Sequence, residues 1–373
     1  MKEKGVTKIA LILLVLVCVF AIVACSDNVN TDGVVYVSYD TYAVVTGYIG
    51  TESDVKIAAF YKDLPVISIE NNAFYNCKSL TSVTIPDSVT SIGEDAFDGC
   101  TSLKSVTIGS GVTSIGDSAF EDCTSLTSVN ITDIAAWCNI SFGGFSANPL
   151  VYAKNLYLNN NLVTALTIPD SVTSIGNYAF YDCTSLTSVT IPDSVTSIGN
   201  YAFYDCTSLT SVTIPDSVTS IGNIAFYGCT SLTSVNITDI AAWCNISFGD
   251  FFVNPLYYAK NLYLNNNLVT ALTIPDSVTS IGGRAFSNCR SLTSVMIPDS
   301  VTSIGDIAFY GCTALKTVYY KGTAADWVKI SIGNNNSYIT NTKRYYYSES
   351  KPTGSGNYWH YVDGKPTVWP SDE

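Results

Sequence analysis

The sequence predicts a β-rich solenoid, a stack of similar coils joined by short helical or 3-10 turns. A 23-residue unit, seen at residues 174–196 as SIGNYAFYDCTSLTSVTIPDSVT, returns in the same phase along most of the chain. Its phenylalanine recurs at Phe74, Phe97, Phe120, Phe180, Phe203, Phe226, Phe286 and Phe309. A cysteine follows three residues after each, at Cys77, Cys100, Cys123, Cys183, Cys206, Cys229, Cys289 and Cys312. One unit cannot bury its apolar residues alone, whereas stacked units share a continuous core.

Each part of the unit predicts one part of a coil. In LTSVTIP (186–192), Val189 and Ile191 alternate with polar residues, which is the pattern of a strand with one buried face. A Pro-Asp pair ends this strand, and SVTSIG (194–199) predicts a second short extended run. In NYAFYDC (200–206) the Ala, Phe and Cys are spaced so that a short helical or 3-10 turn points all three inward.

The order Ile-Gly-x-x-Ala-Phe-x-x-Cys-x-x-Leu-x-x-Val-x-Ile-Pro resembles the consensus of the BspA-like leucine-rich-repeat surface proteins. The resemblance covers nearly all of residues 34–369 and rests on a highly specific repeat. It implies a secreted or cell-surface protein that binds host or matrix proteins or other cells. It brings no catalytic motif, and a fold of this kind does not identify a binding partner.

The N-terminus predicts export. Three lysines precede an apolar run at residues 9–24, which is too short for a comfortable membrane span and predicts a signal peptide at 1–24. The tetrapeptide Ile-Val-Ala-Cys at 22–25 resembles a bacterial lipobox, which implies diacylation of Cys25. We expect residues 25–33 to tether the chain at the bacterial cell surface or outer membrane. The alternatives are an ordinary signal peptide, or an uncleaved anchor in which Cys25 is incidental.

Two insertions interrupt the period. The intervals from Cys123 to Cys183 and from Cys229 to Cys289 are each 60 residues long, and the two inserts are near duplicates at an offset of 106 residues. We therefore expect an N-terminal β cap at 34–68, a solenoid at 69–318 with inserts at about 131–167 and 237–273, and a C-terminal cap at 319–373. An Asp-Gly pair between two aromatic runs predicts a hairpin at the end of this cap.

Each insert predicts a helix and a hairpin. In the first, Asp133 is placed to cap a short helix that carries Trp137, whose expected role is to fill a gap in the core, and NLYLNNNLVTALTIP predicts a hairpin with an Asn-rich turn. The second insert repeats this pattern. A weaker third copy at 323–333 has Val328 in place of Cys138, which predicts an apolar packing position for that cysteine.

Five aromatic residues are candidate ligand contacts. Phe145, Phe251 and Phe252 lie where the two inserts differ, and binding residues are often held on loops that a rigid scaffold positions. Trp359 and Trp369 in the C-terminal cap are further candidates, although packing in the core or at an edge is the more frequent role of such residues.

The eight repeated cysteines predict a structural column. Adjacent coils would bring their Cα atoms to about 5 Å, within the range for disulfides, but side chains stacked in register point the same way. No Cys-x-x-Cys spacing indicates zinc or redox chemistry, so we expect reduced thiols that pack as small hydrophobic groups. The repeated Asp after Pro could bridge calcium, but one carboxylate per coil supplies few of the six to eight oxygens needed, and a turn-forming role is expected.

Neither catalysis nor nucleic-acid binding is indicated. The chain has one histidine, His360, and lacks the Gly-x-Ser-x-Gly, HExxH, P-loop and GxGxxG motifs, so we expect no enzyme activity and no cofactor. A formal net charge of −13 disfavours nucleic acid. The expected function is binding of a protein ligand on a host, matrix or neighbouring cell. The alternative is a structural or glycan-contacting surface protein.

Overall fold

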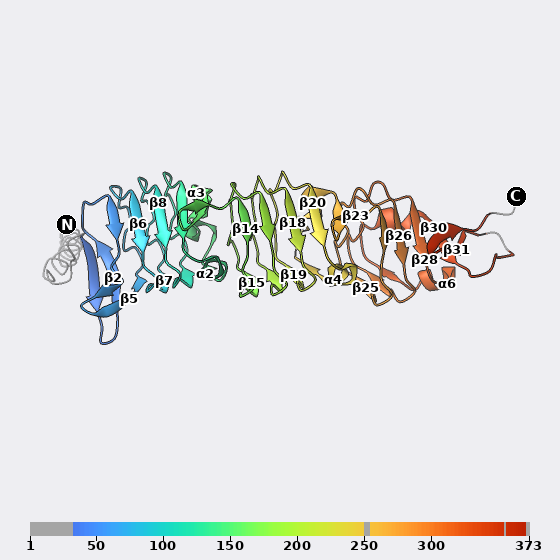
Figure 1. Cartoon of the computed structure of the whole chain (residues 1–373), viewed down its shortest axis with the longest axis horizontal. Coiled ribbons are helices and arrows are strands. Elements are labelled where there is room, and N and C mark those ends of the chain that lie inside the picture. The colour runs from blue at the N-terminus through green and yellow to red at the C-terminus, as the bar shows by residue number, and fades with distance from the viewer. Residues whose placement is uncertain (1–32, 250–253, 354–355, 371–373) are drawn as a thin grey trace, which may run out of the picture.

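The chain forms a rod of coils stacked along one axis (Figure 1). The computed structural model describes residues 33–249, 254–353 and 356–370. The expected signal peptide, Cys25 and almost all of the tether lie outside these residues. In the part of the chain that is described, none of the helices is long and apolar enough to cross a bilayer. The predicted β-rich solenoid is confirmed.

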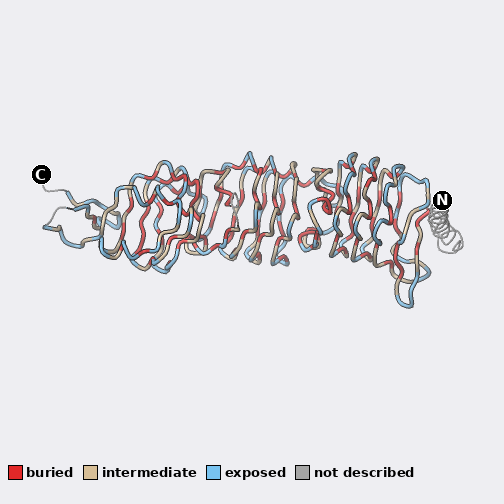
Figure 2. The backbone as a smooth tube through the Cα atoms, turned by 180° about the vertical axis from the view of Figure 1, so that it is seen from behind, coloured by how far each residue is buried: buried red, intermediate tan, exposed pale blue. Residues whose placement is uncertain are grey.

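Each coil contributes a longer and a shorter strand to two separate faces of the rod. Strand β18 (Ser211–Ile214) alternates half-buried and buried residues, as its sequence predicts. Its Val212 pairs with Val189 of the preceding coil and Val235 of the following one, in parallel and in register. Buried residues therefore recur at the same place in every coil (Figure 2), and the apolar positions join into one core.

The long-strand face, in the upper part of Figure 1, consists of three sheets. The first contains β3 (Asp54–Lys56), β6 (Ser82–Ile85), β8 (Ser105–Ile108), β10 (Ser128–Ile131), β12 (Leu156–Leu158) and β13 (Asn161–Leu162). The second contains β14 (Ala165–Thr167), β16 (Ser188–Thr190), β18, β20 (Ser234–Ile237), β22 (Leu262–Leu264) and β23 (Asn267–Leu268). The third contains β24 (Ala271–Thr273), β26 (Ser294–Ile297), β28 (Thr317–Tyr320), β30 (Lys343–Tyr347), β31 (Tyr358–Val362) and β32 (Lys365–Val368).

The short-strand face also consists of three sheets. The first contains β1 (Val34–Ser38), β2 (Ala43–Tyr48), β4 (Phe60–Tyr61), β5 (Leu64–Ile69), β7 (Ser91–Ile92), β9 (Ser114–Ile115) and β11 (Ser141–Phe142). The second contains β15 (Ser174–Ile175), β17 (Ser197–Ile198), β19 (Ser220–Ile221) and β21 (Ser247–Phe248). The third contains β25 (Ser280–Ile281), β27 (Ser303–Ile304) and β29 (Ser331–Ile332). The antiparallel pair β1–β2 covers the N-terminal end of the core.

The inserts end one long-strand sheet and begin the next. Strands β12 and β13 form the predicted antiparallel hairpin, with Asn159 and Asn160 in the left-handed turn that asparagine tolerates. The second insert repeats the hairpin with β22 and β23. The inserts also hold α2 (Ile134–Cys138), the 3-10 helix η2 (Phe145–Ala147), α3 (Leu150–Ala153), α4 (Ile240–Asn245) and α5 (Leu256–Ala259), while α6 (Ala324–Trp327) and α7 (Ser337–Thr340) belong to the third copy.

The inserts are tied to the coils on either side by buried polar contacts. Asp133 caps α2 by accepting a hydrogen bond from the Ala136 amide, as predicted. Trp137 is fully buried, and its Nε1 donates to the carbonyl oxygen of Ala179 at 2.7 Å, in the coil that follows. The Gly176 amide donates to the Cys138 carbonyl oxygen at 2.8 Å. Helix α2 therefore joins two blocks of the rod whose sheets are not continuous.

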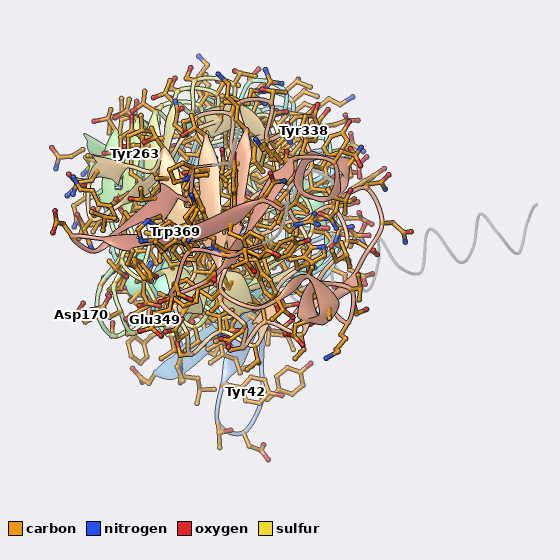
Figure 3. All side chains as sticks on the ribbon, turned by 90° about the vertical axis from the view of Figure 1, so that its right-hand side faces the viewer. Tyr42, Asp170, Tyr263, Tyr338, Glu349 and Trp369 are labelled. Atoms are coloured by element: carbon orange, nitrogen blue, oxygen red, sulfur yellow. The ribbon has the colours of Figure 1, made fainter. Side chains whose placement is uncertain are left out.

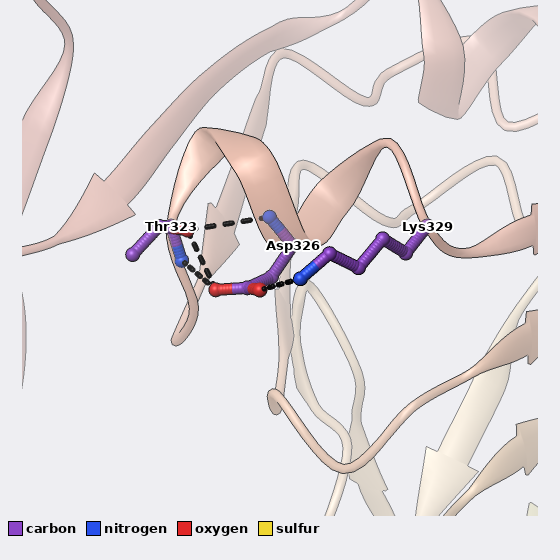
Figure 4. Close-up of polar contacts among 3 residues, drawn as sticks. All are labelled: Thr323, Asp326 and Lys329. Carbon is purple, nitrogen blue, oxygen red and sulfur yellow. Dashed lines mark hydrogen bonds and ion pairs between the residues drawn. The ribbon is translucent and has the colours of Figure 1, made fainter.

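The third copy of the insert pattern differs from the other two at the end of its helix. Helix α6 begins with a capping box in which Thr323 and Asp326 satisfy each other's backbone amides, and Lys329 lies 2.7 Å from Asp326 (Figure 4). Hydrogen bonds from Lys329 and Thr323 lower the pKa of Asp326 to about 2. The predicted apolar packing position of Cys138 and Cys244 is confirmed, because both are buried. Val328, their counterpart in the third copy, is instead 79% exposed, because the helix ends at Trp327.

Candidate interaction surface

One outer edge of the rod is built from the turns that carry the variable residues of the repeat. In the unit at 174–196, two positions before the buried Ala179-Phe180 pair and two after it differ between coils. Successive turns are hydrogen-bonded to one another, for example from the Phe180 amide to the Ala202 carbonyl oxygen at 2.8 Å. We call the central part of this edge the turn ridge. It consists of residues 94–99, 117–122, 177–182, 200–205 and 223–228, with 145–154 of the first insert between the second and third turns.

The middle of the turn ridge carries stacked aromatic rings, which we call the tyrosine ladder: Tyr178, Tyr181, Tyr201, Tyr204 and Tyr227. All five are half-buried. Tyr181 and Tyr204 stack with ring centroids 4.6 Å apart, and Tyr204 stacks on Tyr227 at 5.6 Å. Tyr178 and Tyr201 form a second row at 5.1 Å, and Tyr178 is inclined by 48° to Tyr181. Burial, then the neighbouring Tyr204, raises the pKa of Tyr181, so this phenol is neutral at physiological pH.

Two tyrosines of the ladder occupy a backbone conformation that favours other residue types. Tyr178 has φ 62° and Tyr201 has φ 57°. The same turn position holds Asn72, Asp95 and Ser118 in earlier coils and Ile224, Arg284 and Ile307 in later ones, all with positive φ. Short polar residues adopt this left-handed conformation more readily than bulky ones. The conformation is therefore a property of the repeated turn and does not depend on the tyrosines.

Carboxylates flank the ladder. Asp182 follows Tyr181 and is paired with Lys154 at 2.7 Å, whereas Asp205 occupies the equivalent place after Tyr204. Burial, and then the charge of Asp182, raises the pKa of Asp205. The ionised form of Asp205 is therefore disfavoured in the folded chain relative to its neutral form, and a cation beside it would stabilise the ionised form.

A separate hollow lies on the long-strand face. Its volume is about 490 Å³, and it is lined by Ser211, Thr213, Thr233, Ser234, Asn236, Asn261, Tyr263 and Asn266. The Asn266 amide donates to the Asn236 side-chain oxygen at 2.9 Å and so fixes one wall. Viewed along the rod, Tyr263 lies at the upper left and Tyr338 of α7 at the upper right (Figure 3). The hollow is thus a polar depression with one aromatic ring.

The repeat decides the family. A family model described as BspA type Leucine rich repeat region matches six copies over residues 64–148, 152–251 and 258–345. The chain belongs to this BspA-type leucine-rich repeat family. No curated protein matches it.

Solved structures similar to this BspA-type chain come from several bacteria. A leucine rich cell surface protein from Faecalibacterium prausnitzii is 26% identical, with 81% of this chain and 97% of that one covered and a TM-score of 0.36. A leucine-rich repeat protein from Bacteroides ovatus is 24% identical, with 85% and 94% covered and a TM-score of 0.43. The pneumococcal vaccine antigen PcpA is 16% identical, with 86% and 93% covered and a TM-score of 0.37. The family assignment rests on the repeat match and not on these likenesses.

The predicted contact residues have different positions in the BspA-type rod. Phe145 is 55% exposed and lies beside the tyrosine ladder, with its ring centroid 6.4 Å from that of Tyr181. Phe251 and Phe252 lie outside the described residues. Trp369 is half-buried, stacks on His360 at 3.6 Å and donates from Nε1 to the Ser348 carbonyl oxygen. Of Phe145 and Trp369, Phe145 has the more exposed side chain.

Trp359 is a core residue, so the prediction that it contacts a ligand is wrong. It has no exposed surface, and its Nε1 donates to the Tyr320 carbonyl oxygen at 3.0 Å. The predicted terminal hairpin of β31 and β32 turns at Asp363-Gly364, where both residues have positive φ. Tyr361, on the same strand as Trp359, reaches the Met296 sulfur at 3.2 Å. The hairpin thus folds back toward earlier strands, and this long-range contact is not encoded in the local sequence.

The repeated cysteines form the column that the repeat predicts, with a contact that sequence did not reveal. The thiol of each buried cysteine that follows a regular coil donates to the carbonyl oxygen of the phenylalanine 26 residues earlier, as in Cys123 to Phe97 and Cys206 to Phe180. All the described cysteines are free thiols, and Cys77 is half-buried. Burial raises the pKa of Cys123 and of Cys229 to about 12. These groups therefore remain thiols at neutral pH.

Sequence reasoning missed the tyrosine ladder. The available signal was the identical phase of two tyrosines in the adjacent units at 174–196 and 197–219. The variable part of the first insert pointed to Phe145, at one end of this surface, but not to the rows of tyrosines in the regular coils.

Proposed function

We propose that the chain is a non-enzymatic cell-surface lipoprotein that binds other proteins through its solenoid, with the tyrosine ladder and Phe145 as the contact surface. The observation that supports this is the double row of half-buried tyrosines on an outer edge of a rigid rod. Tyrosine gives large contact area at low cost in conformational entropy and is enriched in protein interfaces. The partner would lie on a host cell, in the matrix or on a neighbouring cell.

The proposed location rests on the N-terminal sequence and the family. Diacylation at Cys25 would attach the mature chain to the membrane, because two acyl chains give stable anchoring where one is marginal. One solved relative is itself described as a cell surface protein. A rod attached at one end would hold the ladder, in the middle of the sequence, away from the bilayer.

The positions of the histidine and the acidic residues are consistent with a binding scaffold that has no catalytic role. His360, on strand β31 of the C-terminal hairpin, stacks on Trp369, and this structural ring contact accounts for it. Acidic residues lie mainly in repeated turns, which does not favour the unique environment that a general acid or base needs.

Glycan contact is the second candidate function, and the hollow on the long-strand face supports it. A sugar packs one face on an aromatic ring and directs its hydroxyls to amides and hydroxyls, which is the combination of Tyr263 with Asn236, Asn261 and Asn266. A glycan array with residues 26–373 tests this candidate, with Tyr263→Ala as the variant that should abolish any signal.

Binding to a panel of purified matrix and cell-surface proteins tests the principal proposal. Residues 26–373 would be compared with the triple variant Tyr181→Ala, Tyr204→Ala, Tyr227→Ala, and with Tyr157→Ala, Tyr263→Ala on the other face as a control. We expect the ladder variant alone to lose its protein ligand while its circular dichroism spectrum stays unchanged. Equal binding by all three proteins would contradict the proposed contact surface.

A further inference from the structure

The turn ridge is continuous from an acidic stretch into the tyrosine ladder. Its first two turns carry Glu94, Asp95, Asp98, Asp117, Glu121 and Asp122. The Asp122 amide donates to the Tyr152 hydroxyl at 3.0 Å, and Phe145 of the same insert lies over Tyr181. The first insert therefore joins the two stretches, although it interrupts the sheets on both faces.

The negative charge of this ridge is not balanced within it. Its five turns carry eight carboxylates, namely the six above with Asp182 and Asp205, and the insert between them contributes a single cation, Lys154. Asp98 is surrounded by Asp95, Asp122 and Glu121, whose charges add to burial in raising its pKa. Such like charges side by side are unfavourable until a cation lies among them.

Two of the three ladder turns pair an aromatic ring with a carboxylate, whereas Tyr227 in the third is followed by Gly228. We call each such turn a rung. Asp182 directly follows Tyr181, and Asp205 directly follows Tyr204. Lys154 already occupies the first rung through its ion pair with Asp182. Elsewhere in the chain, Arg344 lies 3.7 Å from the centroid of Trp327. A guanidinium suits such a rung best, because it is planar, stacks on rings and can bind a carboxylate through two N–H groups.

From this geometry we propose that the turn ridge binds an extended, arginine-rich segment of a partner protein, with its basic side chains over Asp98, Glu121 and Asp205 and its guanidinium groups against the tyrosine ladder. This rests on the proposed function and specifies the chemistry of the partner. The two parts of the ridge have different roles. The acidic turns attract the basic segment through their charge, and the tyrosines favour arginine over lysine.

Fluorescence anisotropy with labelled nona-arginine, nona-lysine and nona-glutamate tests the proposal. Residues 26–373 should bind nona-arginine more tightly than nona-lysine, by about threefold or more, and should not bind nona-glutamate. The variant Asp98→Asn, Glu121→Gln, Asp205→Asn should weaken nona-arginine binding by about tenfold or more. A matched variant, Asp170→Asn, Asp193→Asn, Asp216→Asn, removes the same charge from exposed turns outside the ridge and should change the Kd by less than about threefold.

Three results would overturn the proposal. Equal weakening by the two charge variants would show that any acidic surface suffices. Unchanged preference for arginine in Tyr181→Ala, Tyr204→Ala, Tyr227→Ala would show that the ladder takes no part. A panel protein that requires the ladder but is not displaced by nona-arginine would overturn this inference and leave the proposed function standing. Melting temperatures of all variants separate lost binding from lost folding.

Discussion

The thiol of Cys206 donates a hydrogen bond to the carbonyl oxygen of Phe180 at 3.2 Å, across one coil boundary. Phe180 stacks in turn on Phe203, three residues before that cysteine, with centroids 5.3 Å apart. The two columns are therefore coupled: each buried cysteine that follows a regular coil is hydrogen-bonded to the turn of the preceding coil, while the rings fill the space beside it.

Replacing Cys206 with alanine should lower the free energy of unfolding by about 1–3 kcal/mol, because it opens a small cavity and removes a donor from a buried carbonyl group. Urea denaturation monitored by circular dichroism measures the change. The exposed neighbour Thr207→Ala is the control. Equal stability of the Cys206→Ala variant and the control would show that the thiol column does not stabilise the stack.

Cys77 should be the first thiol to react in the folded chain. It is half-buried at the N-terminal end of the column, and a side-chain hydrogen bond with Cys100 lowers its pKa, whereas burial raises the pKa of Cys123 to about 12. Titration of residues 26–373 with Ellman's reagent should show one fast thiol, absent in Cys77→Ser, and the others only after unfolding. Several fast thiols, or none at all without denaturant, would contradict this arrangement.

Neutralising Asp98 should stabilise the fold. Burial and the charges of Asp95, Asp122 and Glu121 raise its pKa in the folded chain, so its ionised form is disfavoured there relative to the unfolded chain. Asp98→Asn should therefore have a higher Tm than the parent at neutral pH. The difference should shrink as the pH falls through the raised pKa and vanish below the ordinary value of 3.8, where both chains are neutral at this position. A lower Tm for Asp98→Asn at neutral pH would refute this, with exposed Asp170→Asn as the control.

Removing the cap of α2 should destabilise the join between two blocks. Asp133→Ala deprives the Ala136 amide of its acceptor and should cost about 1 kcal/mol, and Thr323→Ala should cost a similar amount at α6. Thermal unfolding of both variants, compared with exposed Lys104→Ala, measures this effect. No difference from the Lys104→Ala control would mean that packing of Trp137 alone holds the helix.

The sequence predicted those parts of the structure that short-range rules determine. The period, the strand alternation, the cap at Asp133 and the Asn-rich and Asp-Gly turns all have local signals. The burial of Trp359 depends instead on a hairpin folding back toward Met296, and Val328 turns outward because α6 ends one residue earlier. The tyrosine ladder arises only when equal phases of separate coils are stacked, so single residues did not reveal it.

Hydroxyl-radical footprinting of the tyrosines, with and without bound nona-arginine or a bound panel protein, tests most directly that the turn ridge is the contact surface. Oxidation of Tyr181, Tyr204 and Tyr227 should fall on binding, while that of Tyr157 and Tyr263 on the long-strand face should stay the same. Protection of Tyr157 and Tyr263 with no change at the ladder would contradict it.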